Sequence, residues 1–268
     1  MEGRILQFER ISNAWQLGGY QTEDGKRVKP GVLFRSGMLE RATGADLEKL
    51  TQACGVSTVI DLRTAREAAQ HPDPVLPGVR YEPVAVMEES RDAGNQLAII
   101  EIYRTHKDDV GRAYVEMARA GALAEDMYTC FFTSESSMAA YRRFFEVLLD
   151  STGPVLWHCT GGKDRAGLAT VMLLSLLGVP EQTALEDFSL ANEVNRTEIL
   201  YKVSQAKRYT EDPEELGTVA DLAGVSPVCM ARVFDLARAE NIPMCTFIRQ
   251  KLGLSWEEVA QLRKKYLE

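Results

Sequence analysis

Residues 158–165, HCTGGKDR, place a cysteine and an arginine at the two ends of a seven-residue segment. The segment follows the apolar run 155–157, which predicts a buried strand, and precedes an apolar stretch from Leu168 that has the spacing of a buried helix. A loop between a strand and a helix can direct its backbone N–H groups, and the positive end of the helix, at one point. Gly161 and Gly162 allow a tight bend and a close approach to bound oxygens. The sequence therefore predicts a cradle for a phosphate group.

The two ends of this segment carry complementary chemistry. A positive environment lowers the pKa of a thiol, so Cys159 is the expected nucleophile, attacking phosphorus as a thiolate. Arg165 offers a planar fork of donors that can hold two phosphoryl oxygens while the transition state forms. His158 is expected to support the loop or tune the thiolate, because a thiolate needs no general base.

The leaving group of such a reaction needs a proton, and two carboxylates are candidate donors. Asp61 follows the β-branched run 56–60, which predicts a parallel strand, and the carboxyl edge of a parallel sheet is where ligands bind. Asp164 is the alternative, although a negative charge inside a phosphate loop is unfavourable unless it is paired or protonated. Asp61 is the preferred donor, although an Asp after a strand is also a common helix cap or turn residue, so its role has less support than that of the phosphate loop.

Other interpretations of the loop are less well supported. A single cysteine before a helix is usually a small buried hydrophobe, and Lys163 could be an ordinary solvated charge. A nucleotide-binding glycine loop is excluded, because no earlier glycine has the required spacing and Asp164 follows the lysine in place of Ser or Thr. The residues expected to bind phosphate are Thr160, Gly161, Gly162, Lys163, Asp164 and Ala166.

The length, net charge and apolar content of the chain exclude several classes of protein. The chain has 268 residues, 45% of them hydrophobic, which is enough for one domain of residues 1–268 with a sizeable core. A net charge of -8 argues against nucleic acid as the main partner. Residues 1–12 lack the apolar core of a signal peptide, so a cytoplasmic location is expected, with leaderless secretion left open. The longest apolar run, 168–179, is too short to cross a bilayer, and no integral membrane segment is expected.

Cysteine and histidine usage predicts neither disulfides nor a cofactor. The five cysteines are scattered without a CxxC pair, which favours a reducing compartment. The three histidines have no metal-binding spacing. We therefore predict no metal and no cofactor.

The order of elements predicts an α/β fold. Strand patterns alternate with helix patterns as far as Gly178, and the rest of the chain has only helix patterns. This order fits a parallel sheet flanked by helices on both faces, with an additional helical cap. Segments of about 92–128 and 190–225 are candidate lids over the site.

Several segments resemble one known family. Residues 158–167, HCTGGKDRAG, resemble the HCxxGKDRTG signature of bacterial atypical tyrosine and lipid phosphatases of the CX5R type. Four further segments of the chain resemble the same family: 13–20, 28–37 (VKPGVLFRSG), 58–63 (TVIDLR) and 252–262.

This resemblance implies a fold and roles for individual residues. The fold would be the protein-tyrosine-phosphatase α/β sandwich, with Cys159 as nucleophile and Arg165 as phosphate ligand. Asp61 of the Asp-Leu-Arg motif would be the general acid, with Arg63 in support. A lysine at the position of Lys163 is shared with phosphoinositide phosphatases. The resemblance therefore implies phosphotyrosine proteins or phosphoinositides as substrates, with dual specificity for phosphoserine or phosphothreonine left open.

Two positions depart from the family pattern. Ala166 stands where the family has Thr or Ser, whose hydroxyl helps the thiolate to leave, so hydrolysis of a phosphocysteine is expected to be slow. Trp15-Gln16 replaces Arg-Asp, which puts in doubt whatever pairing that dipeptide makes near the site.

Three functions are therefore compatible with the sequence. The leading hypothesis is a phosphomonoesterase that forms a phosphocysteine intermediate, with phosphotyrosine as the first substrate to test. A phosphoinositide phosphatase is the second, and a slow or inactive phosphoryl-binding module is the third. Sulfur transfer is less favoured, because it has no evident use for an acid at Asp61.

Overall fold

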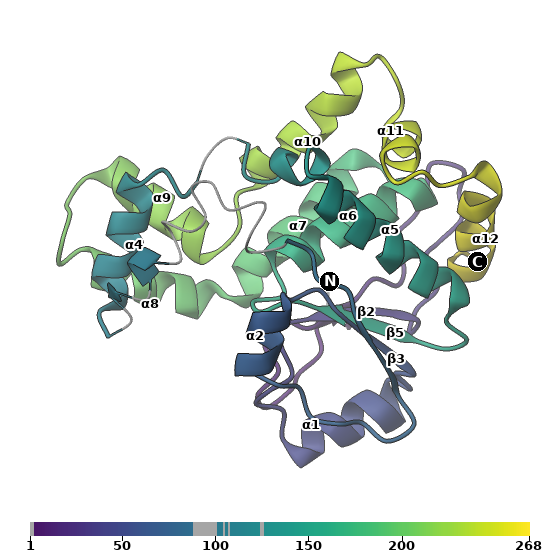
Figure 1. The fold of residues 1–268 in the computed structure, drawn as a ribbon, viewed down its shortest axis with the longest axis horizontal. Helices are drawn as coiled ribbons and strands as arrows, with labels where there is room; N and C mark the ends of the chain where they lie inside the picture. Colours follow the sequence, from purple (N-terminus) through teal and green to yellow (C-terminus); the bar gives the residue numbers. More distant parts are fainter. Residues whose placement is uncertain (1–2, 88–100, 104, 107, 124–125) are drawn as a thin grey trace.

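The computed structural model describes residues 3–87, 101–103, 105–106, 108–123 and 126–268. Its centre is a five-stranded sheet in the order β1-β2-β5-β3-β4 (Figure 1). The strands β2, β5, β3 and β4 are parallel, and only β1 pairs antiparallel with its neighbour. The strands are β1 (Trp15–Gln16), β2 (Leu33–Ser36), β3 (Thr58–Asp61), β4 (Arg80–Pro83) and β5 (Val155–His158).

The strands β2, β3 and β5 are buried on both faces, as expected for the inner strands of a parallel sheet, whereas the edge strand β4 is largely exposed. Alternate side chains enter different cores because successive residues of a strand point to opposite faces. Trp157 of β5 and Ile60 of β3 belong to the main core, whereas Leu156 and Val59 belong to a second, smaller core. Layers of side chains on both sides thus fix the strand β5 that leads into the loop.

Helices occupy both sides of this sheet (Figure 1). Helix α1 and the π-helical turn η1 contribute to the smaller core, while α5, α6, α7 and α10–α12 form the main core on the other face. The bounds of these helices are α1 (Gly44–Glu48), η1 (Lys49–Ala53), α2 (Ala65–Gln70), η2 (Thr129–Phe132), α5 (Glu135–Asp150), α6 (Asp164–Leu177), α7 (Glu181–Val194), α10 (Pro227–Ala239), α11 (Met244–Lys251) and α12 (Trp256–Tyr266).

The predicted α/β class is confirmed, and several helices begin or end at residues whose sequence pattern is typical of helix caps. Thr43 caps α1 and Ser255 caps α12 through reciprocal capping boxes, and Ser226 caps α10 just before a proline at its first position. Gly178 ends α6 with a left-handed backbone. No helix within the described ranges is both long enough and apolar enough to cross a bilayer.

Three helices form a separate small unit beside the main body. They are α4 (Val110–Arg119), α8 (Arg196–Ala206) and α9 (Pro213–Ala223). They pack on one another around their own apolar cluster, and Figure 1 shows them displaced to one side of the sheet. The two predicted lid segments contain these helices, but residues 92–100, 104, 107 and 124–125 of the first segment lie outside the described residues. Closure over the site remains a prediction.

Candidate active site

The loop between β5 and α6 carries Cys159 at the carboxyl end of a central strand. The strand ends at His158 and the helix begins at Asp164, so the expected strand-loop-helix order is present. Cys159 is 2% exposed. Gly162 has φ +67°, and a Cβ added there would lie 2.3 Å from the carbonyl oxygen of Ser36. Only glycine fits this position, because both the backbone conformation and the neighbouring strand exclude a side chain.

Arg165 points to helix α2, where it forms a two-pronged ion pair. Its Nη1 lies 2.6 Å from Oε2 of Glu67, and its Nη2 lies 2.7 Å from Oε1. The hydroxyl of Thr160 donates to Oε1 of Glu67 at 2.6 Å. The two ends of the loop are thus joined through one carboxylate, which holds the guanidinium in a fixed orientation.

Glu67 was not among the candidates from the sequence. The available signal was Thr64-x-x-Glu67, the capping-box pattern directly after the Asp-Leu-Arg motif. Glu67 does accept from the backbone N–H of Thr64 at 2.9 Å, so it caps α2 and binds Arg165 with the same carboxylate. The capping-box pattern indicates that Glu67 caps α2, whereas its contact with Arg165 depends on the fold.

The Glu67–Arg165 pair should make stability depend on pH in the acid range. Burial alone would raise the pKa of Glu67, but the hydrogen bonds and charge of Arg165 outweigh it and lower the pKa from 4.5 to about 2. A depressed carboxyl pKa stabilises the folded state above the unfolded value, and this contribution is lost as the pH falls towards 2.

We therefore expect Glu67→Gln to lose less stability than the parent between pH 4.5 and pH 2. Urea unfolding of both proteins across this range measures the difference in slope. Identical slopes for parent and variant would show that the pair contributes nothing to acid stability.

Asp61 lies in a buried polar network behind the loop. It accepts hydrogen bonds from Nε and Nη2 of Arg63, at 2.9 and 2.8 Å, and from the hydroxyl of Tyr81. Burial raises the pKa of Asp61, but the hydrogen bonds from Arg63, the charge of His158 and the Tyr81 hydroxyl together lower it. These contacts hold Asp61 as a carboxylate, which disfavours it as a proton donor.

Asp73 joins the same network to His158. It lies 2.7 Å from Nη2 of Arg63 and 3.0 Å from Nε2 of His158. Asp61, Asp73 and His158 each offer one ligand atom, all within 4.8 Å of one another. The guanidinium of Arg63 already binds both carboxylates, so this group is better explained as a charge network that supports His158 than as a metal site.

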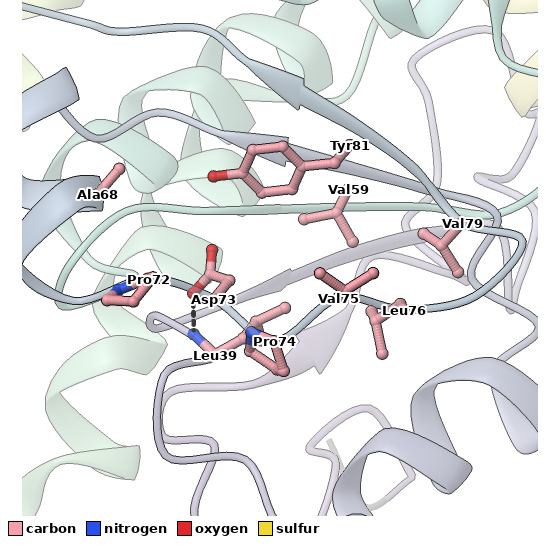
Figure 2. A pocket seen from close by; sticks show the side chains of 10 residues that line it. All are labelled: Leu39, Val59, Ala68, Pro72, Asp73, Pro74, Val75, Leu76, Val79 and Tyr81. Atoms are coloured by element: carbon pink, nitrogen blue, oxygen red, sulfur yellow. Dashed lines mark hydrogen bonds between the residues drawn. The ribbon is translucent and has the colours of Figure 1, made fainter.

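A cavity of about 320 Å³ lies next to this network. Figure 2 shows it between Tyr81 and Val59 on one side and the segment from Pro72 to Leu76 on the other. Asp73 contributes to the lining, but no residue of the loop 159–165 does. The cavity is therefore separate from the phosphate cradle.

The two charged residues just before Arg165 have partners in other elements. Asp164 accepts a hydrogen bond from the hydroxyl of Tyr128 at 2.9 Å and is partly exposed. The amine of Lys163 donates to the carbonyl oxygens of Leu222 and Gly224, at 2.7 and 2.5 Å. Lys163 thus binds the carboxyl end of α9, where a cation is favourable, and links the loop to the α4/α8/α9 unit.

The residues that depart from the family pattern also have defined places. Ala166 is fully buried in the first turn of α6. Gln16 accepts from the backbone N–H of Gly31 at 2.7 Å, and the indole of Trp15 donates to Asp187 at 3.0 Å. The dipeptide Trp15-Gln16 therefore makes its own contacts in place of an Arg-Asp pair.

Comparison with known proteins places the chain in a family. The sequence profile of the tyrosine phosphatase family matches residues 6–268. A protein of Cupriavidus necator whose name places it among tyrosine-protein phosphatases is 32% identical over 71% of this chain and 64% of its own length. A tyrosine-protein phosphatase of Nostoc commune is 30% identical over 61% of this chain and 49% of its own. The triple specificity protein phosphatase PtpB of Mycobacterium tuberculosis is 27% identical over 70% of each chain.

These matches confirm the family resemblance seen in the sequence. The chain matches less than two thirds of the length of the first two relatives, whereas the family profile covers nearly all of the chain itself. The chain therefore belongs to the tyrosine phosphatase family.

Proposed function

We propose that this protein is a phosphomonoesterase that hydrolyses phosphotyrosine in proteins through a phosphocysteine intermediate. The observation that carries the proposal is the arrangement of Cys159 at the end of β5, inside a loop that closes on Arg165 at the start of α6. The relatives named as tyrosine-protein phosphatases support the same substrate class.

The reaction has two steps. In the first, the Cys159 thiolate attacks phosphorus, the P–S bond forms, the P–O bond to tyrosine breaks, and a carboxylic acid protonates the departing phenolate. In the second, the carboxylate accepts a proton from water, the oxygen attacks phosphorus, and the P–S bond breaks to release inorganic phosphate and the thiolate. Arg165 would hold the phosphoryl oxygens in both steps.

Release of inorganic phosphate from a phosphotyrosyl peptide tests this proposal. We expect turnover by the parent protein at neutral pH. Binding of the peptide without any release of phosphate, from this peptide or from para-nitrophenyl phosphate, would instead identify a phosphoryl-binding module.

The geometry favours Asp164 over Asp61 as the proton donor. Asp164 is part of the loop and is partly exposed, whereas Asp61 is buried and accepts hydrogen bonds from three N–H groups of Arg63 and from the Tyr81 hydroxyl. We expect Asp164→Asn to lower kcat/KM for phenyl phosphate by roughly 10²–10⁴-fold, the range for general acid catalysis. The loss should be much smaller for 2,4-dinitrophenyl phosphate, whose leaving group needs no proton.

Two controls separate the candidates. Tyr128→Phe removes the hydrogen bond to Asp164 but keeps the carboxyl group, so it should show little dependence on the leaving group. Asp61→Asn should affect both substrates equally, through the network around His158. If Asp61→Asn shows the dependence on the leaving group and Asp164→Asn does not, Asp61 is the acid.

The phosphoinositide alternative depends on whether Lys163 can reach a second phosphate. Its amine is bound to carbonyl oxygens of Leu222, Ala223 and Gly224, and a substrate would have to displace these contacts. We therefore expect Lys163→Met to leave the ratio of phosphoinositide to phosphotyrosine turnover unchanged. The variant should also be less stable by about 1.5–3 kcal/mol, the usual contribution of charged hydrogen bonds.

Chemical denaturation and turnover of both substrates check this expectation. Lys202→Met is a matched control, because Lys202 lies in the same helical unit and pairs with Glu198 there. A tenfold or larger loss confined to phosphoinositides in Lys163→Met would show that the lysine leaves α9 to bind substrate.

A further inference from the structure

One side of the loop is bound by a buried arginine from a neighbouring strand. Arg35 lies in β2, which pairs with β5. Its Nη2 donates to the carbonyl oxygen of Gly162 at 2.8 Å and to that of Lys163 at 3.2 Å. Arg35 is fully buried, so these contacts are shielded from water. One guanidinium group thus binds two successive peptide groups of the phosphate cradle.

Two further groups bind the preceding carbonyls of the loop. Nδ2 of Asn13 donates to the carbonyl oxygen of Gly161 at 2.8 Å, and the backbone N–H of Met38 donates to that of Thr160 at 3.2 Å. Asn13 itself has a left-handed backbone, with φ 56°, which asparagine tolerates better than most residues. The carbonyls of residues 160–163 are therefore all bound by groups outside the loop.

This pattern determines where the N–H groups point. In a planar trans peptide the C=O and the following N–H point in opposite directions. With the carbonyls of Gly162 and Lys163 bound by Arg35, the N–H groups of Lys163 and Asp164 are directed to the other side of the loop. An oxyanion held there is stabilised by donors that are already oriented, at no cost of reorganisation.

Arg35 is itself held by a buried set of side chains. Its Nη1 lies 3.1 Å from Oδ2 of Asp187, and both side chains are 0% exposed. Oδ1 of Asp187 accepts from the indole of Trp15 at 3.0 Å and from the hydroxyl of Tyr20 at 2.8 Å. The Trp15 ring also stacks on the guanidinium, 4.3 Å from ring centroid to Cζ. The orientation of Arg35 is thus fixed by β1, β2 and α7 together.

Stability alone does not explain this arrangement. Burying an ion pair costs desolvation energy that the attraction between the charges often fails to recover, and an apolar replacement is often as stable. A charge that is buried against the loop and aimed at its carbonyls therefore indicates a role in the site.

We propose that Arg35, held by Asp187 and Trp15, is a positioning residue that presents the N–H groups of the loop to the phosphoryl oxygens. This inference rests on the proposed function, because it assumes that the loop binds a phosphoryl group. The positioning role also explains Trp15, which stands where the family has an arginine. The indole of Trp15 stacks on Arg35 and donates to Asp187, so Trp15 orients Arg35 without placing a second positive charge beside it.

The test measures anion affinity separately from catalysis. Binding of inorganic phosphate to the Cys159→Ser protein is measured by calorimetry, alone and combined with Arg35→Lys or Trp15→Phe. Arg35→Lys keeps the charge but loses the fork that joins Asp187 to the loop carbonyls. Trp15→Phe keeps an aromatic ring against Arg35 and removes the indole N–H, so it is the milder variant if Arg35→Lys fails to fold.

We expect Arg35→Lys to weaken phosphate binding at least tenfold, and Trp15→Phe to weaken it two- to fivefold. In proteins that retain Cys159, both changes should lower kcat/KM. Lys265→Met is the control for destabilisation, because the Lys265 amine binds carbonyl oxygens of Leu148 and Leu149 at the end of α5. It should lower the melting temperature and leave phosphate affinity unchanged.

The outcomes distinguish this inference from the proposed function. Unchanged phosphate affinity in a folded Arg35→Lys protein, or in Trp15→Phe where Arg35→Lys does not fold, would overturn the positioning role while leaving the phosphatase proposal intact. No phosphate binding by the Cys159→Ser protein itself, together with no turnover by the parent, would overturn both.

Discussion

Replacing Cys159 with serine should lower the hydrolysis of para-nitrophenyl phosphate by at least about 10³-fold, since loss of a covalent nucleophile generally removes most of the rate enhancement. A serine hydroxyl in the same loop stays protonated at neutral pH, so the positive environment that activates a thiolate cannot activate it equally. The assay is steady-state release of nitrophenol across pH.

Two other free cysteines provide matched controls for this change. Cys54 and Cys245 are half-buried and lie outside the loop, so serine at either position should leave kcat/KM within about twofold of the parent. The Cys159→Ser protein should also keep the parent's melting behaviour. Comparable hydrolysis by Cys159→Ser and the parent would exclude Cys159 as the nucleophile.

Replacing Arg165 with lysine should lower kcat/KM by roughly 10²–10³-fold, the usual cost of losing one oriented oxyanion donor. Lysine keeps the positive charge, but it cannot hold two oxygens in one plane as guanidinium does. It would also lose one arm of the two-pronged pair with Glu67. Most of the loss should appear in kcat if Arg165 binds the transition state more tightly than the substrate.

Arg142→Lys controls for the general cost of this substitution. Arg142 binds Glu258 at 2.6 Å and Glu146 at 3.0 Å, outside the loop. Lysine there should change stability slightly and activity not at all. An Arg165→Lys protein with more than a third of the parent's kcat/KM would show that the fork is not needed for catalysis.

Local sequence patterns predicted the elements that form the loop. The apolar run before His158 became β5, and the broad apolar face after Ala166 became α6. Both elements lie in the core, and their apolar residues occupy the positions that a buried strand or helix requires. The local pattern was therefore sufficient to predict them. The capping patterns at Thr43 and Ser255 were equally informative, because a capping box satisfies backbone groups within one turn.

Contacts between distant segments could not be predicted in this way. Glu67 and Arg165 are 98 residues apart, and they meet because the fold brings α2 next to the start of α6. The partner of Lys163 is a set of backbone carbonyls on α9, which no side-chain pattern in the sequence indicates. The sequence shows which charged residues lie near the loop in the chain, but their pairing depends on the order of strands in the sheet.

The position of Asp61 could be predicted from the sequence, but its partners could not. Its place at the carboxyl end of β3 was predicted from the strand pattern. Its ion pair with Arg63 follows from a short turn, and the hydroxyl of Tyr81 comes from the neighbouring strand β4. These partners determine whether the group is a carboxylate or an acid, and they depend on tertiary structure.

Detection of a phosphoryl group on Cys159 is the most direct test of the proposed phosphocysteine chemistry. Parent protein and Ala166→Thr are mixed with para-nitrophenyl phosphate, quenched in acid within the first turnovers, and digested for mass spectrometry. The proposed chemistry predicts a phosphoryl group on the Cys159 peptide, with faster steady-state turnover in Ala166→Thr because its hydroxyl helps the thiolate to leave. Turnover with no phosphoryl group on Cys159 in either protein, together with an equally active Cys159→Ser protein, would contradict it.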